Sequence, residues 1–339
     1  MKRALVTGIT GQDGSFLMEL LQSMDYEVWG VIRRSSNADA INRIHHLSKG
    51  TVNLRYGDLT DSASISRIIT ESRPHEVYNL AAQSHVRVSF DIPEYTSEVN
   101  GTGVLNILEA LRVSRPESKF YQASTSEMFG ISPPPQNEET LLHPRSPYGV
   151  AKVQGYWSVR NHRESYNMFA SNGILFNHES ERRGENFVTR KITKAVARIK
   201  LGIMKEEFTL GNLDAKRDWG YAKDYVEAMH LILQHDTPED FVIGTGKAHT
   251  VREFLEAAFR AVDIPVTSDG DEGIDEKYLR MDTGEVVLRL DSRFYRPAEV
   301  DFLCGDATKA KQLLGWEPKT SFEQLVELMV KNDLEKEAE

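Results

Sequence analysis

The sequence predicts an α/β protein built on a doubly wound parallel sheet, with a smaller C-terminal α/β domain. Apolar strand-like runs alternate with helical stretches through the first half of the 339-residue chain, which is typical of parallel sheets covered by helices. A glycine-rich turn follows the first run, at residues 2–7. Polar side chains follow the run at residues 119–123, where open sheets hold their ligands. Together these three features predict a Rossmann fold.

The glycine turn occupies residues 8–14, with the spacing G-x-x-G-x-x-G, and an amphipathic helix follows to about Met24. Glycines there allow a tight turn and let backbone amides approach a pyrophosphate at the helix N-terminus. An ordinary glycine-rich turn is the alternative. The position between an N-terminal strand and a helix favours a dinucleotide site.

The second predicted strand, residues 27–32, ends in Arg33, Arg34, Ser35 and Ser36. An NAD site usually has an acidic residue here, which binds the ribose 2′-hydroxyl. Two guanidinium groups and two hydroxyls suit a 2′-phosphate instead, so the sequence favours NADP over NAD. A solvated basic turn is the alternative interpretation.

The third and fourth predicted strands, residues 52–56 and 76–80, also end in residues that suit a cofactor. Asp58 follows the third strand and is placed to accept a hydrogen bond from an adenine amino group. Ala81 and Ala82 follow the fourth, and such small residues allow close backbone approach to a cofactor.

Tyr148 and Lys152 stand four residues apart at the start of a predicted helix, with Ser146 as its N-cap and Pro147 in its first turn. This spacing places both side chains on one helix face. We expect the Lys152 ammonium to lower the pKa of Tyr148 from about 10 toward neutrality. Such a tyrosine can remove a proton from a sugar or steroid hydroxyl. The spacing alone is weak support, since chance pairs occur on many surface helices.

We expect the dinucleotide-binding domain to span residues 1–176, with parts of residues 217–245 returning to it. Residues 177–339 then form most of the substrate-binding domain. Five basic residues are scattered through that second part, and they would make a diphosphate site if folding brought them together. They are Arg183, Arg190, Lys191, Arg217 and Arg296. The alternative is that each is a surface charge.

The overall composition disfavours several classes of protein. The formal net charge is −10, which argues against a general nucleic-acid surface. Cys304 is the only cysteine, so no intrachain disulfide forms, which fits a reducing compartment. No apolar run reaches transmembrane length, and the N-terminus enters a strand at once. We therefore expect a cytoplasmic protein without a membrane partner.

These motifs resemble the extended short-chain dehydrogenase/reductase family over almost the whole chain. Within it, six stretches resemble the GDP-mannose 4,6-dehydratase branch. They are residues 8–14, 33–34, 124–130, 177–184, 217–220 and 294–300. The resemblance implies a tightly held NADP that is reduced and reoxidised within one turnover. It also implies that GDP-D-mannose is converted to GDP-4-dehydro-6-deoxy-D-mannose and water.

The resemblance further implies four catalytic residues. Thr125 hydrogen-bonds the sugar O4, and Tyr148, poised by Lys152, takes the O4 proton while C4 gives up hydride. Glu127 removes the proton from C5 and helps water leave from C6.

Many binding residues are implied in the same way. The cofactor contacts are Gly8, Ile9, Thr10, Gly11, Gln12, Asp13, Arg33, Arg34, Ser35, Ser36, Asp58, Leu59, Leu80, Ala81, Ala82, Gln83, Ser84, Tyr95, Lys152, His178 and Arg183. The substrate contacts are Ser84, Ser126, Asn177, Lys191, Arg217, Arg296 and Glu299. No metal ion is implied.

Glu127 separates the candidate activities on chemical grounds. Elimination of water across C5–C6 needs a proton acceptor, whereas a sugar-nucleotide 4-epimerase or 4-reductase needs no base at C5. A charge at a strand end is the plain alternative for Glu127. A non-catalytic NADP-binding regulator on the same fold is a further alternative, although Thr125, Glu127, Tyr148 and Lys152 together speak against it.

In this family, helices corresponding to residues 94–112 and 148–165 pair across a dimer, and the Arg33–Arg34 loop can reach a neighbour to make a tetramer. A homodimer or homotetramer is therefore expected. The acidic segment at residues 269–290 resembles nothing that assigns it a role.

Overall fold

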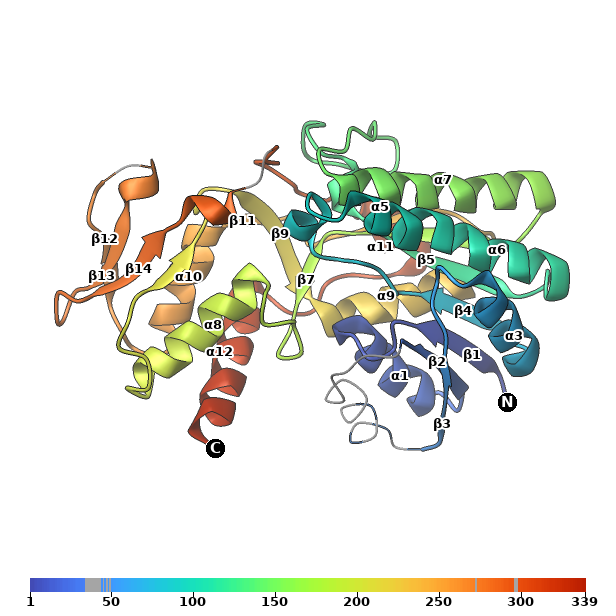
Figure 1. The fold of residues 1–339 in the computed structure, drawn as a ribbon, viewed down its shortest axis with the longest axis horizontal. Helices are drawn as coiled ribbons and strands as arrows, with labels where there is room; N and C mark the ends of the chain where they lie inside the picture. The colour runs from blue at the N-terminus through green and yellow to red at the C-terminus, as the bar shows by residue number, and fades with distance from the viewer. Residues whose placement is uncertain (34–43, 45, 47, 49, 272, 296–297) are drawn as a thin grey trace.

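The computed structural model describes residues 1–33, 44, 46, 48, 50–271, 273–295 and 298–339. The described chain forms two lobes (Figure 1). The larger lobe is built on a parallel sheet and contains the N-terminus. The smaller one contains two short sheets and the C-terminal helix. The predicted α/β fold is confirmed.

Among the described residues, the large lobe has a seven-stranded sheet in which every neighbouring pair is parallel. In spatial order its strands are β10 (Phe241–Ile243), β6 (Ala170–Leu175), β5 (Lys119–Thr125), β4 (Glu76–Asn79), β1 (Arg3–Thr7), β2 (Glu27–Ile32) and β3 (Val52–Tyr56). The order reverses direction beside β1, and such a switch point is where this kind of sheet binds ligands.

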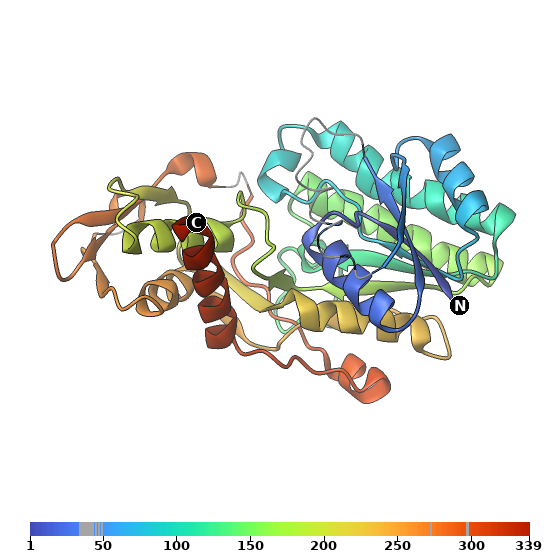
Figure 2. The same cartoon turned by 90° about the horizontal axis from the view of Figure 1, so that it is seen from below.

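Helices cover both faces of this sheet, as Figures 1 and 2 show. They are α1 (Gln12–Ser23) and α9 (Ala222–Gln234) on one face, and α3 (Ser62–Ser72), α6 (Gly103–Ser114) and α7 (Pro147–Tyr166) on the other. Neighbouring residues of β1 point to opposite faces of the sheet. Leu5 therefore packs with the helices α3, α6 and α7, and Val6 packs with α1 and α9. The middle of β1, residues 4–6, is therefore apolar on both faces, as buried parallel strands are.

Short helical segments connect β4 to α6. They are α4 (Val86–Ser89), α5 (Pro93–Ser97) and the π-helical turn η1 (Glu98–Thr102). A Cβ added at Gly101 of this turn would lie 2.2 Å from the Gln154 side chain of α7. The glycine therefore lets η1 approach α7 closely.

The small lobe contains the remaining sheets of the described chain. One is three-stranded, with β11 (Ala248–Thr250), β9 (Lys216–Tyr221) and β7 (Asn177–Glu179). The other is four-stranded, with β12 (Val266–Ser268), β13 (Lys277–Arg280), β14 (Val286–Leu290) and β8 (Phe208–Leu210). The helices α8 (Val188–Lys200), α10 (Val251–Arg260) and α12 (Phe322–Ala338) pack on them around a separate apolar core.

The chain crosses between the lobes several times. It passes from β6 into β7, returns through β9 and α9 to β10, and enters the small lobe again at β11. The short helix α11 (Thr308–Leu314) and Trp316 rejoin the large lobe, where Trp316 Nε1 donates to the Asp224 carbonyl oxygen at 2.9 Å. The two lobes are thus held by several covalent connections.

Within the described ranges, no helix is long and apolar enough to cross a bilayer.

Candidate active site

A cavity of about 740 Å³ opens at the carboxyl ends of β4, β5 and β6. The large lobe contributes Leu80, Thr125 and Tyr148 to its lining, and the small lobe contributes Lys191 and Arg217. The cavity therefore lies between the lobes, at the edge where the sequence places its polar groups.

The glycine turn leads into α1 beside this cavity. Gly8 has φ +67, and an added Cβ would lie 2.8 Å from the Ala81 nitrogen. An added Cβ at Gly14 would lie 2.3 Å from the Gly8 carbonyl oxygen. The N-cap residue Gly11 gives α1 no side-chain cap, so the first amides of the helix are left for a ligand. This is the geometry that binds a pyrophosphate.

The segment after β4 is held by hydrogen bonds on both sides. Thr7 Oγ1 accepts from the Leu80 and Ala81 amides at 3.2 and 3.1 Å. On the other side, Asn100 Oδ1 accepts from the Gln83 amide at 2.9 Å, and Asn100 Nδ2 donates to the Gln83 carbonyl oxygen at 2.8 Å. Sequence reasoning assigned Asn100 no role. Its position on the turn η1, far along the chain from Gln83, gave no local signal.

The groups predicted for the adenosine end lie at the ends of β2 and β3. Arg33 is exposed, and its guanidinium donates to the Tyr95 hydroxyl. Asp58 Oδ1 accepts from the Thr60 amide at 3.0 Å and the Thr60 hydroxyl at 2.9 Å, and Leu59 is buried. Arg34, Ser35 and Ser36 lie outside the described residues.

The structure brings only some of the predicted cofactor contacts to the cavity wall. Those that line it are Asp13, Leu80, Ala82, Ser84, Lys152, His178 and Arg183. Of the other predicted contacts that the structure describes, Gln12 and the rest of the glycine turn, Ala81, Gln83, Arg33, Asp58, Leu59 and Tyr95 do not line it. They extend from it along the same sheet edge.

The four predicted catalytic residues all line the cavity. Thr125 ends β5, and its Oγ1 accepts from the Glu127 amide at 3.3 Å in the short helical turn η2 (Ser126–Met128). The side chain of Ser146 accepts from the Gly149 amide at 3.0 Å and caps α7, which carries Tyr148 and Lys152. The predicted start of this helix is confirmed.

The catalytic side chains are almost fully buried, with Glu127, Tyr148 and Lys152 respectively 7%, 8% and 4% exposed. Burial raises the pKa of Tyr148 to about 12; a hydrogen bond with the Thr125 side chain opposes this rise, and the negative charge of Glu127 adds to it. Burial also lowers the pKa of Lys152 to about 8, which the Asp13 carboxylate opposes.

The predicted lowering of the Tyr148 pKa is therefore wrong for the protein chain by itself. Lys152 Nζ donates to the Ala123 carbonyl oxygen at 2.8 Å and lies 5.8 Å from the centre of the Tyr148 ring. At that position its charge does not overcome the burial of the phenol.

The predicted substrate groups Ser84, Ser126, Asn177, Lys191, Arg217 and Glu299 also line the cavity. Lys191 Nζ lies 3.7 Å from the centre of the Phe294 ring, and burial lowers the pKa of this lysine. Arg217 is 6% exposed, and one guanidinium nitrogen lies 3.5 Å from Glu299 Oε1. Arg296 lies outside the described residues.

Arg190 does not join this group of cations. Its guanidinium lies 2.6 Å from Asp333 Oδ1 in an ion pair between α8 and α12, with both side chains buried. It is a structural residue here, because its charge is already matched by a neighbouring carboxylate.

Sequence reasoning missed several residues of the cavity wall. His85 lines it, accepts from the Val88 amide at its Nδ1 at 3.3 Å, and faces the Phe187 ring at 5.6 Å. Glu179 also lines it and accepts from the Thr189 hydroxyl at 2.5 Å. His85 directly follows Ser84 at a strand end, so its position could have indicated it.

Comparison with known proteins gives a consistent match. The protein family described as GDP-mannose 4,6 dehydratase matches residues 5–329. The protein named GDP-mannose 4,6 dehydratase from Drosophila melanogaster is 55% identical, over 98% of this chain and 86% of its own. The protein of that name from Homo sapiens is also 55% identical, over 98% of this chain and 91% of its own.

A solved structure of another protein shares the fold of this chain. The UDP-glucose 4-epimerase of Thermus thermophilus, crystallised in complex with NAD, has a TM-score of 0.79 and 26% identity, and the match covers 98% of both chains. The fold is therefore one that binds a nicotinamide dinucleotide.

Proposed function

The chain belongs to the GDP-mannose 4,6-dehydratase family, and we propose that it is the hydro-lyase that converts GDP-D-mannose to GDP-4-dehydro-6-deoxy-D-mannose and water. The observation that carries this proposal is a buried carboxylate, Glu127, in the same cavity as Tyr148. A base beside the site of C4 oxidation is what elimination across C5–C6 requires.

The residues of the site fit a nicotinamide cofactor, and NADP is the form we propose. The glycine turn approaches Ala81 too closely for a side chain, and the uncapped start of α1 suits a pyrophosphate. Arg33 at the end of β2 suits a 2′-phosphate. When bound, oxidised NADP supplies a cationic hydride acceptor that holds the hydride from C4 until C6 is ready for it.

Tyr148 is the proposed acceptor of the O4 proton. With a pKa of about 12 it is a neutral phenol in the protein chain alone, so it becomes a base only when positive charge approaches it. Thr125 hydrogen-bonds Tyr148 and is placed to hold the same sugar oxygen. Lys152, fixed on the Ala123 carbonyl, keeps a positive charge on this side of the cavity.

Glu127 is the proposed acid and base at C5 and C6. Loss of hydride from C4 and a proton from O4 makes a ketone, which acidifies the C5 proton. Glu127 takes that proton and returns it to the departing C6 hydroxyl, so one water leaves. The hydride taken from C4 would be added at C6, and the proton that Tyr148 took from O4 balances the proton that C5 would gain, so the overall reaction needs no outside oxidant or reductant.

The small lobe supplies the proposed binding groups for the GDP part. Lys191 and Arg217 bring two positive charges to the cavity, and a guanidinium is well suited to phosphate oxygens. Asn177, Ser84 and Ser126 are proposed contacts of the hexose. Glu299, beside Arg217, is placed to orient that guanidinium or to meet a sugar hydroxyl.

A direct test is anaerobic incubation of the protein with GDP-mannose and no added reductant, followed by mass spectrometry. The proposal predicts a 4-keto product lighter by one water and no net oxidation or reduction of NADP. A 4-reductase would require a keto substrate and consume NADPH stoichiometrically, and a 4-epimerase would leave the mass unchanged. A non-catalytic regulator would leave GDP-mannose intact.

We also propose that the protein assembles through α6 and α7. Exposed apolar side chains lie along these helices, among them Val113 and Tyr166 at their C-terminal ends and Trp157 in the middle of α7. A second copy that pairs with this face would bury them. Sedimentation equilibrium would distinguish a homodimer or homotetramer from a monomer. A cytoplasmic location stays a prediction from the sequence.

A further inference from the structure

The first turn of α1 and the segment that follows β6 are joined by hydrogen bonds. His178 Nε2 lies 2.8 Å from Asp13 Oδ2, although the two residues are 165 positions apart. Gln12 Nε2 donates to the His178 carbonyl oxygen at 3.1 Å, and Gln12 Oε1 accepts from the Ser180 hydroxyl at 2.8 Å. The helix that begins at the glycine turn is thus bonded directly to β7.

The inner contact of this junction is an ion pair. His178 Nδ1 lies 2.7 Å from the Phe176 carbonyl oxygen, while Nε2 faces the Asp13 carboxylate. Both partners are acceptors, so both ring nitrogens carry hydrogen and the imidazole is charged. Burial disfavours this charge, but the Asp13 carboxylate raises the pKa of His178 above its ordinary value.

The imidazole cannot easily turn away from Asp13. The Tyr225 ring of α9 stacks on it, with 4.6 Å between ring centres and 25° between ring planes. In the sheet, His178 stands opposite Gly220 of β9. An added Cβ at Gly220 would lie 2.3 Å from the Tyr225 ring, so this glycine lets the tyrosine reach the histidine.

The ion pair lies at the junction of two binding surfaces. Asp13 lies within the glycine turn proposed to bind the pyrophosphate. His178 directly follows Asn177, and Arg183 comes five residues later along the same segment; all of these residues line the cavity. Any shift of β7 relative to α1 would therefore move the sugar-binding groups relative to the nicotinamide site.

We propose that Asp13 and His178 are positioning residues, and that their ion pair holds the substrate-binding segment in register with the cofactor-binding turn. This inference rests on the proposed function, because it takes a GDP-sugar as the ligand of that segment. It differs from the role that the family resemblance implies, in which both residues only contact the cofactor.

The two roles predict different results when NADP is saturating. If the residues only contact the cofactor, excess NADP restores the site, and GDP then binds the variants as it binds the wild type. If they position β7, GDP affinity falls even at saturating NADP. The Kd for GDP, measured by calorimetry, should then rise about tenfold in Asp13→Asn and in His178→Gln, within the range that contacting residues show in double-mutant cycles.

The double variant tests whether the two residues act as one unit. Once the ion pair is broken, removing the second partner should change little, so the double variant should bind GDP no more weakly than the weaker single variant. In steady-state assays at saturating NADP, the same variants should raise KM for GDP-mannose as well as lower kcat. Ser180→Ala, which removes only the bond to Gln12, should raise the Kd for GDP by a smaller factor.

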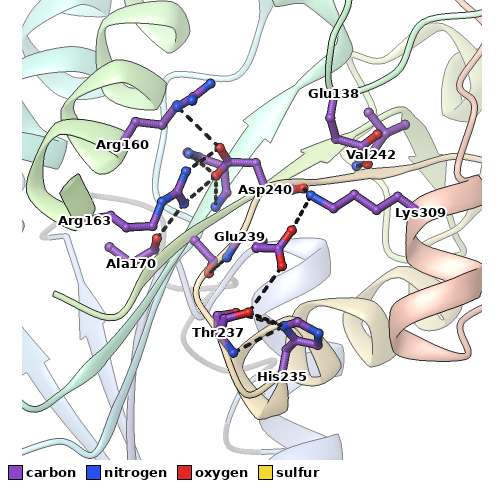
Figure 3. A network of polar contacts seen from close by, with 12 residues as sticks. Glu138, Arg160, Arg163, Ala170, His235, Thr237, Glu239, Asp240, Val242 and Lys309 are labelled. Atoms are coloured by element: carbon purple, nitrogen blue, oxygen red, sulfur yellow. Dashed lines mark hydrogen bonds and ion pairs between the residues drawn. The ribbon is translucent and has the colours of Figure 1, made fainter. Parts of the chain in front are cut away.

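Asp240→Asn is the matched control for loss of a buried ion pair. Asp240 is 7% exposed and binds the Arg163 guanidinium through both oxygens, at 2.9 and 2.8 Å (Figure 3). Neither residue lines the cavity. This variant should lower the melting temperature and leave the Kd for GDP unchanged, which separates a general loss of stability from a loss of register.

Four results would be decisive against the inference, and the first of them also against the proposed function. Wild-type protein that does not bind GDP at all would remove the proposed function and this inference with it. Wild-type protein that binds GDP, with Asp13 and His178 variants that match it at saturating NADP, would overturn the inference alone. The same holds if Asp240→Asn weakens GDP binding as much as they do, or if the effects of Asp13→Asn and His178→Gln simply add.

Discussion

Glu127→Gln is the variant that most directly separates the steps of the proposed reaction. The amide keeps the size and hydrogen-bonding capacity of the carboxylate in a site where the side chain is 7% exposed, but it cannot accept the C5 proton. Loss of a positioned acid–base group costs about 10²- to 10⁴-fold in rate, or about 3–5 kcal/mol of barrier. We expect the overall turnover of GDP-mannose to fall by that factor.

The first step should survive the same substitution. The Glu127 charge raises the pKa of Tyr148, so its removal lets that pKa fall from about 12 and increases the fraction of tyrosinate that can take the O4 proton. Oxidation at C4 should then be at least as fast as in the wild type. Because elimination is blocked, the hydride has no C6 acceptor and reduced cofactor accumulates.

Stopped-flow absorbance in the near ultraviolet, where reduced nicotinamide absorbs, measures both effects after mixing with GDP-mannose. Glu239→Gln is the matched control. Glu239 is half-buried outside the cavity and binds Lys309 at 2.8 Å, and this variant should turn over normally. If Glu127→Gln formed no reduced cofactor, or made product at the wild-type rate, Glu127 would not be the base at C5.

Three further substitutions test other parts of the structure. Tyr148→Phe should prevent cofactor reduction by GDP-mannose in the same stopped-flow assay, because it removes the acceptor of the O4 proton; cofactor reduction at the wild-type rate would assign that proton to another group. Asp333→Ala should lower the free energy of unfolding in urea by about 3–5 kcal/mol, because it leaves the Arg190 guanidinium, now 2.6 Å from Asp333, buried without its partner. A loss below about 1 kcal/mol, as for a surface pair, would contradict this. Glu109→Gln should lower the melting temperature at neutral pH, because hydrogen bonds from Arg112 and then His162 lower the pKa of Glu109 from 4.5 to about 2. That stabilisation is fully present above pH 4.5 and is lost as pH falls toward 2, so the difference between variant and wild type should shrink over this interval. A difference that is constant with pH would show that the charge of Glu109 has no part in it.

Features coded by neighbouring residues were predictable from the sequence. The glycine turn, the start of α7 at Ser146 and Pro147, and the alternation of strands and helices in the first half each depend on short patterns of residue type. The same holds for the location of Thr125 and Glu127 at a strand end. Family resemblance then supplied the identity of the cavity groups, which local patterns do not contain.

Features that depend on contacts across the chain were not predictable. Arg190 looks like any cation near Lys191 in the sequence, but α12 brings Asp333 against it from the far end of the chain. The segment at residues 269–290 was assigned no role from the sequence, yet its described residues form β13 and β14, which lie between β12 and β8 in one sheet. In that sheet the short strands are fixed by their partners more than by their own composition.

The predicted lowering of the Tyr148 pKa was wrong for a similar reason. The spacing to Lys152 is local, but the charge state depends on what surrounds both side chains. Ala123 takes the lysine's hydrogen bond, and burial and Glu127 raise the tyrosine pKa. A motif therefore places the residues, while their reactivity is set by neighbours from other elements.

In the proposed function, the large lobe carries the catalytic groups and the small lobe binds the diphosphate. The acid and base groups are fixed within the large lobe, where Thr125 accepts from the Glu127 amide and Lys152 binds the Ala123 carbonyl. The cations proposed for the diphosphate are fixed within the small lobe, on α8 and β9. A hexose can react only if the catalytic groups and the diphosphate-binding cations contact the substrate at the same time. Its C4 must therefore lie against the nicotinamide while its diphosphate is bound in the small lobe. The hydrogen bonds between α1 and β7 run between these two sets. For this reason the register of β7 on α1 affects binding and catalysis together, although neither Asp13 nor His178 need touch the reacting carbons.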